Sequence, residues 1–166
     1  MTLLDQILDA WRQNGAILQA LAEKLTPDQL SLRLAEGEMD IAEHLCHVHG
    51  TRRWWIWSVD EARLEGTERL HLPNGDDWVA IRDLEIIRAR LPESAAQVEA
   101  LTQDWLAGAE LRRGPYETPL RFLMHQVWHE GWHVGAICAI LRVHGQELNE
   151  DWEDHNLWGR WRDPGA

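Results

Sequence analysis

Apolar residues recur at helical spacing in four separate stretches of the chain, and polar segments separate these stretches. In the first stretch, the spacing of the apolar positions predicts a helix over about residues 3–25. Asp40 is a suitable N-cap, and the apolar positions after it predict a second helix over about residues 40–63. The first half of the chain is therefore expected to form two long helices.

The second half of the chain gives two further helical patterns. Apolar residues over 84–105 keep their register across Pro92, so we expect either one kinked helix or a short helix that restarts at the proline. The longest pattern runs from 119 to about 144, and Gly145 ends it. The segment 66–78 between the halves contains Gly, Pro and an Asn-Gly turn signal, and we interpret it as a loop.

Four helical patterns without a strand pattern or an internal repeat predict an all-α protein with the architecture of a four-helix bundle. A chain of 166 residues can bury enough apolar surface for one domain. We therefore expect a single domain over 1–166, with its core at about 3–145. The Trp-rich C-terminal tail, 146–166, is expected to run as an ordered segment over the bundle.

The charge of the chain argues against several classes of partner. Its formal net charge is −12, from 16 Lys and Arg against 28 Asp and Glu, and this charge repels nucleic acid and anionic membrane surfaces. The start "MTLLDQILDAWRQ" lacks a basic region followed by a continuous apolar run, and no apolar stretch reaches about 18 residues. We expect a cytoplasmic protein that binds neither nucleic acid nor membrane.

Tryptophan and cysteine usage adds two expectations. The chain has 11 Trp against one Phe and one Tyr, and we interpret the cluster Trp54, Trp55 and Trp57 as core and interface rather than pocket. Cys46 and Cys138 have apolar or histidine neighbours within helical patterns, which is typical of buried free thiols. We expect both cysteines to be reduced and unpaired.

The strongest chemical signal is the stretch "HEGWH", in which His129 and His133 are four residues apart. On a helix the two side chains lie about 40° apart around the axis and about 6 Å apart along it, so both can bind one metal ion. His125 lies one turn earlier, and three collinear histidines cannot all converge on one ion. We interpret His125 as a core residue or as a neighbour of a ligand.

A third ligand must come from another helix, because a catalytic site keeps three protein ligands and an open position. The segment "AEHLCHVHG" offers His44 and His47 on one flank of the apolar stripe and His49 on the other flank. The spacing leaves His44 and His47 open and slightly favours His44. The three remaining histidines have no partner at ligand spacing and are interpreted as surface or capping residues; they are His71, His144 and His155.

The letters H-E-x-x-H also occur in metalloproteases, where the glutamate is the general base. The longer protease pattern would need glycine and histidine where this chain has Ala136 and Ala139. Glu130 lies about 100° away from His129 around the helix. We therefore keep Glu130 only as a weak candidate base, interpret it as a solvated side chain, and rank a protease last.

The segments "DIAEHLCHVHGTRRWW" and "HQVWHEGWHVGAI", together with the four predicted helices, resemble the DinB-like family of four-helix-bundle metalloproteins. This family includes YfiT-type hydrolases and S-transferases that use mycothiol or bacillithiol, and its members are often homodimers. The resemblance extends to about Gly145 and implies the metal ligands His47, His129 and His133. Many relatives continue the last ligand as His-Arg-Gly-Gln, whereas this chain lacks the Arg and the Gln.

These observations lead to two hypotheses of different class. The first is an enzyme that uses a divalent metal ion for hydrolysis or thiol S-transfer on a small molecule. Zinc or nickel is the favoured ion, and iron and manganese also accept imidazole ligands. The second is a non-catalytic stress-response or structural module that uses the metal as a staple between helices.

Overall fold

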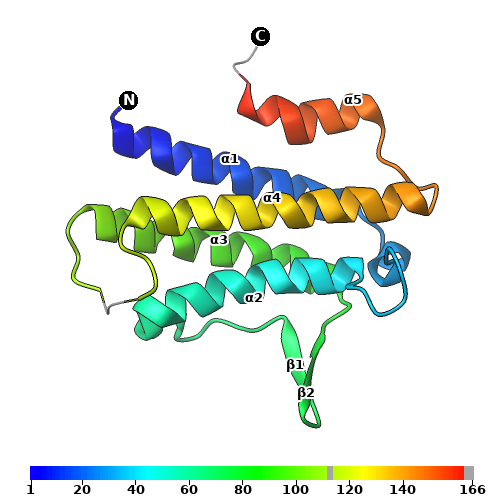
Figure 1. Cartoon of the computed structure of the whole chain (residues 1–166), viewed down its shortest axis with the longest axis horizontal. Helices are drawn as coiled ribbons and strands as arrows, with labels where there is room; N and C mark the ends of the chain where they lie inside the picture. The colour runs from blue at the N-terminus through cyan, green and yellow to red at the C-terminus, as the bar shows by residue number, and fades with distance from the viewer. Residues whose placement is uncertain (112–113, 163–166) are drawn as a thin grey trace.

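Four long helices form the body of the protein in this computed structural model, which describes residues 1–111 and 114–162. They lie side by side (Figure 1) and pack against one another in the pairs α1–α3, α2–α3, α2–α4, α1–α4 and α3–α4. The expected all-α class is confirmed, because the described chain is mostly helical. The bounds of the four helices are α1 Leu3–Lys24, α2 Ile41–Val59, α3 Leu84–Leu106 and α4 Pro119–Val143.

The helices begin at residues that cap them. Asp40 accepts a hydrogen bond from the backbone N–H of Glu43, whose side chain bonds back to the N–H of Asp40, and this capping box pairs two otherwise free donors. α2 is shorter than expected: it ends at Val59, and a 3₁₀ turn, Glu61–Leu64, follows it. The reason is the extended backbone of Asp60, with φ −155°, which no helix can contain.

Pro92 does not divide the third helix, so of the two expected outcomes the structure has the single helix. Next to the proline, the carbonyl of Leu91 accepts a hydrogen bond of 2.7 Å from the Nη1 group of Arg52. The Oγ of Ser94 accepts another from the same Nη1 at 3.1 Å. The side chain of Arg52 in α2 therefore bonds to α3 on both sides of Pro92.

The segment 66–78, expected to be an irregular loop, contains a β-hairpin, and that expectation was wrong. β1 (His71–Asn74) pairs antiparallel with β2 (Asp77–Ala80). Gly75, with φ +64°, takes the first position of the two-residue turn, which favours glycine. The strands have four residues each and are largely exposed, so no alternation in the sequence marks them. The hairpin projects beside α2 (Figure 1).

The described chain after α4, up to residue 162, folds back over α1 (Figure 1). It contains α5 (Glu150–Glu153), a π-helical turn (Asp154–Trp158) and a 3₁₀ turn (Gly159–Trp161). Leu157 is buried and Trp152 packs against the core, whereas Trp158 stays exposed. None of the described helices has the length and apolar composition of a membrane span.

A buried polar layer lies between two hydrophobic clusters of the core. Each of the four long helices contributes one residue to this layer. In every helix, residues of one hydrophobic cluster come before this residue in the sequence and residues of the other cluster come after it. None of the four side chains is more than 6% exposed, so they must pair with one another. The members of the polar layer are Asn14, Arg52, Ser94 and Glu130.

Candidate metal centre

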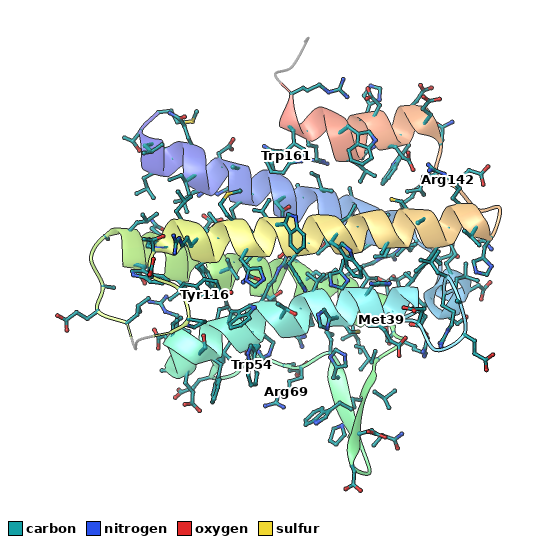
Figure 2. All side chains as sticks on the ribbon, viewed as in Figure 1. Met39, Trp54, Arg69, Tyr116, Arg142 and Trp161 are labelled. Atoms are coloured by element: carbon teal, nitrogen blue, oxygen red, sulfur yellow. The ribbon has the colours of Figure 1, made fainter. Side chains whose placement is uncertain are left out.

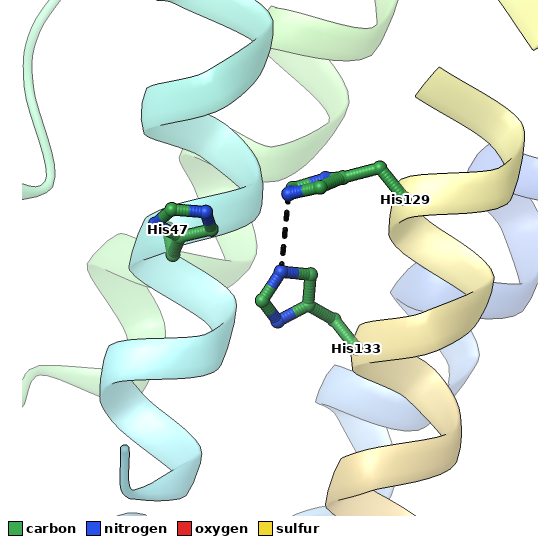
Figure 3. Close-up of side chains that lie close together, drawn as sticks. All are labelled: His47, His129 and His133. Carbon is green, nitrogen blue, oxygen red and sulfur yellow. Dashed lines mark hydrogen bonds between the residues drawn. The ribbon is translucent and has the colours of Figure 1, made fainter. Parts of the chain in front are cut away.

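The structure brings together one histidine of α2 and two of α4. The ligand atoms of His47, His129 and His133 all lie within 4.8 Å of one another, and Figure 3 shows His47 facing the other two across the helix interface. The Nε2 atoms of His129 and His133 are 3.2 Å apart. Nitrogens that share one ion at about 2.1 Å lie about 3.0–3.4 Å apart. The pair His129 and His133 already has this spacing, and with His47 it forms a group that could hold a metal ion.

His44, which the spacing slightly favoured as a ligand, lies behind His133. Its Nδ1 is 2.8 Å from Nδ1 of His133, and both rings are buried. When His133 offers the lone pair of Nε2 to an ion, its proton is on Nδ1 and is donated to His44. Such a hydrogen bond fixes the tautomer and the orientation of a ligand ring.

The surroundings keep the clustered histidines neutral. Burial, followed by the influence of neighbouring histidines, lowers the pKa of His129 to about 4 and that of His133 to about 3. Burial also lowers the pKa of His47. Metal ions bind the neutral imidazole, so protons do not compete for these two α4 nitrogens at neutral pH.

A cavity of about 400 Å³ opens beside the histidines, and we call it the metal-side cavity. His71, expected to be a surface or capping residue, is half-buried and lines it, so that expectation was wrong. His71 belongs to β1, and only the folding of the hairpin against α2 brings it here. The described residues that line the cavity are His47, Gly50, Thr51, Trp54, Trp55, His71, His125 and His129.

The tryptophan cluster of α2 also differs from its expected role. Trp55 lines the metal-side cavity. Trp54 and Trp57 are 59% and 41% exposed and line a second cavity between α2 and the hairpin. Trp55 also packs against the hydrophobic core, as expected. The interpretation was wrong for Trp54 and Trp57, which line cavities, because the hairpin that faces them was not foreseen.

The other histidines lie outside the three-nitrogen cluster. His125 lines the cavity and forms a hydrogen bond with the hydroxyl of Tyr116, in agreement with its interpretation as a neighbour of a ligand. His49 is buried, with Nε2 3.0 Å from the carbonyl oxygen of Glu68. His144 and His155 are exposed and bond to backbone carbonyls, as expected.

Glu130 is not solvated, and this expectation was wrong. Its side chain is 1% exposed, and Oε1 accepts a hydrogen bond of 2.6 Å from Nε of Arg52. Oε2 accepts from Nη2 of Arg52 at 2.7 Å and from Nδ2 of Asn14 at 2.6 Å. The angular offset from His129 turns Glu130 into the interior, because α1 and α2 both pack on α4. Both carboxylate oxygens are occupied in the polar layer.

The helical fold and the three converging imidazoles define a class of protein: an all-α domain with a candidate histidine metal centre between two helices. The model of the DinB family matches residues 1–158, so the chain belongs to the DinB family. The resemblance carried by the two histidine segments is thereby confirmed. Comparison with curated proteins and with solved structures finds no match.

Proposed function

We propose that the chain is a metal-dependent enzyme that binds one divalent ion through His47, His129 and His133. The observation that carries the proposal is the convergence of three neutral imidazoles at the side of an open cavity. The bound ion would supply Lewis acidity that lowers the pKa of a coordinated water or thiol. Zinc or nickel is the ion we favour, with iron and manganese also compatible with imidazole donors.

The residues around the histidines suit a small substrate. Trp54 and Trp55 provide flat apolar walls that shield a substrate from bulk water. His71 and His125 place polar ring nitrogens on the same cavity, where they can orient a substrate. We propose hydrolysis, or S-transfer from a low-molecular-weight thiol of the bacillithiol or mycothiol type, as the reaction.

The buried position of Glu130 and its hydrogen bonds argue against the metalloprotease alternative. A protease of the H-E-x-x-H type uses this glutamate as general base. Here both of its oxygens accept hydrogen bonds from Arg52 and Asn14 inside the core. No free carboxylate of Glu130 is left to take a proton at the metal.

The alternative is a non-catalytic module in which the metal only joins α2 to α4. A structural site is closed, whereas this one borders a cavity of about 400 Å³. The open side favours an enzyme. Metal removal distinguishes the two. If the metal is structural, its removal should lower the melting temperature strongly and abolish no activity. If the protein is an enzyme, metal removal should abolish turnover and lower the melting temperature only modestly.

We further propose a single four-helix-bundle domain over 1–166 that forms a homodimer in the cytoplasm. An apolar stripe on α4 supports the dimer, since its members are spaced by four residues and are 48–72% exposed. Unpaired cysteines agree with a reducing compartment. The stripe consists of Leu120, Met124, Trp128 and Trp132.

Elemental analysis of protein purified without a histidine tag tests the metal centre, and a screen with a low-molecular-weight thiol and an electrophile tests the reaction. We expect about one divalent ion per chain and metal-dependent conjugation or hydrolysis. A variant with alanine at His47, His129 and His133 should lose both. Full metal content in that variant would overturn the proposed site.

A further inference from the structure

A second cavity, of about 470 Å³, adjoins the metal-side cavity. The two share three lining residues, Gly50, Trp54 and His71. We call the second one the arginine cavity, because Arg53 and Arg69 line it. The two cavities therefore lie next to each other along α2 and the hairpin.

The arginine cavity is positively charged although the protein is strongly acidic. Arg53 belongs to α2 and Arg69 to the segment before β1. The pKa of Arg53 is lowered mainly by its own burial and secondly by the nearby positive charge of Arg69, so the two side chains lie close together. Among the residues that the structure describes, no acidic side chain lines this cavity. With a formal net charge of −12, two converging cations without a carboxylate between them are unexpected.

Most of the described arginines form ion pairs, but the two in this cavity do not. Ten form ion pairs within 4.0 Å, whereas Arg53, Arg69 and Arg160 form none in the described chain, and Arg160 lies in the C-terminal tail, away from this cavity. Arg53 donates to the hydroxyl of Thr67. The guanidinium of Arg69 lies 5.0 Å from the ring centroid of Trp78. Both neighbours are neutral, so they orient the guanidinium groups without cancelling their charge.

Two acidic residues, Glu61 and Glu65, line a neighbouring hollow. This shallow hollow shares Arg53, Trp57 and Arg69 with the arginine cavity. Both glutamates are exposed and neither forms an ion pair in the described chain. Exposed charges of this kind are screened by water and salt. Neither glutamate lines the arginine cavity itself.

Gly50 lines both cavities. A glycine inside a helix costs about 1 kcal/mol relative to alanine, so its place in the middle of α2 calls for a reason. A Cβ at this position would lie 3.7 Å from the ring of His71, which is ordinary contact. Alanine therefore fits, but a longer side chain would collide with the ring of His71 or extend into the cavities that Gly50 lines.

We propose that the arginine cavity binds the anionic group of a small substrate with an apolar or aromatic body, while its reactive end lies at the three histidines. This inference rests on the proposed function. Guanidinium groups bind carboxylate, sulfonate and phosphate through paired, charge-assisted hydrogen bonds. Trp54, Trp57 and Trp78 supply the walls for the apolar body. Figure 2 shows Trp54 and Arg69 on the same side of the molecule, below α2.

Calorimetry with matched probes tests the subsite in metal-free protein, where binding to an ion cannot contribute. The probes are naphthalene-2-acetate, the corresponding sulfonate and phosphate, and the neutral naphthalene-2-acetamide. We expect at least one anion to bind about tenfold or more tightly than the amide, with a preference that shrinks as salt rises. Equal affinity of all anions and the amide would overturn the subsite.

Variants locate the binding. Arg69→Gln, at an exposed position, should weaken binding of the anion about tenfold and leave the affinity for the amide unchanged. We expect the same result for Arg53→Gln. Arg121→Gln, which changes the same charge on a distant exposed residue, is the control and should change neither. Unchanged anion affinity in Arg69→Gln would contradict the proposal, and melting curves establish that each variant is folded.

The subsite and the reaction are tested separately. Gly50→Leu adds bulk beside His71 in the lining of both cavities, so it should lower both the affinity for the anion and the turnover of any substrate found. Anion preference in a protein that shows no metal-dependent turnover would refute the proposed enzyme and keep the subsite. Turnover that is indifferent to Arg53→Gln and Arg69→Gln would keep the enzyme and refute the subsite.

Discussion

Replacing Glu130 with glutamine should destabilise the protein. The change keeps the shape of the side chain but removes its charge and turns one acceptor oxygen into an NH₂ group. Arg52 is 1% exposed, so its guanidinium would remain in the core without a counter-charge. At least one of its N–H groups, or the amide of Asn14, would then face another donor.

The magnitude follows from the burial of both partners. Breaking a buried ion pair by removing one charge costs about 3–5 kcal/mol. That is a large part of the roughly 5–15 kcal/mol that stabilises a typical domain. At about 2–4 °C per kcal/mol for a chain of this size, the melting temperature of Glu130→Gln should fall by about 6–20 °C.

Urea unfolding followed by tryptophan fluorescence measures the effect, provided that the denaturant dependence of the unfolding free energy stays unchanged. The matched control is the double variant Arg52→Met with Glu130→Leu, which removes both charges and should recover most of the stability. Metal content of Glu130→Gln, measured at a temperature where it is folded, should remain near the parent value.

Two results would refute this reasoning. One is an unfolding midpoint of Glu130→Gln equal to that of the parent, since the carboxylate would then not hold Arg52. The other is cleavage of casein or peptide libraries by the metal-loaded protein that disappears in Glu130→Gln without a loss of stability. That outcome would identify Glu130 as the general base of a protease.

Three further outcomes follow from the site and its surroundings. His133→Ala should lower metal content to near zero, while His144→Ala should not, as elemental analysis can show. Titration of denatured, unreduced protein should count two thiols, because Cys46 and Cys138 are unpaired. The metal-free protein should lose stability as pH falls from about 6.5 toward 4. In this pH range His129 and His133 bind protons in the unfolded chain but stay neutral in the folded protein, because folding lowers their pKa values. The slope is up to about 1.4 kcal/mol per pH unit for each histidine, and a flat profile would contradict it.

The sequence by itself determined the features that depend on near neighbours. Periodicity and the Asp40 cap set where helices begin, because a cap bonds to groups three residues away. The pair His129 and His133 was also predictable, since one helical turn fixes their distance. The third histidine was not: periodicity left His44 and His47 open, and only the resemblance to the DinB family pointed to His47.

Only the tertiary structure decided what each helix face meets. Helix geometry gives the direction of Glu130 relative to His129. Whether a side chain in that direction meets solvent or Arg52 depends on which helix packs against that face of α4. His71 reached the cavity through a hairpin of four-residue strands whose sequence carries no alternation. Periodicity records the direction of a side chain relative to its own helix, whereas partners, burial and charge compensation depend on segments far away in the chain. Packing therefore assigned Glu130 to the core and His44 to the support of His133.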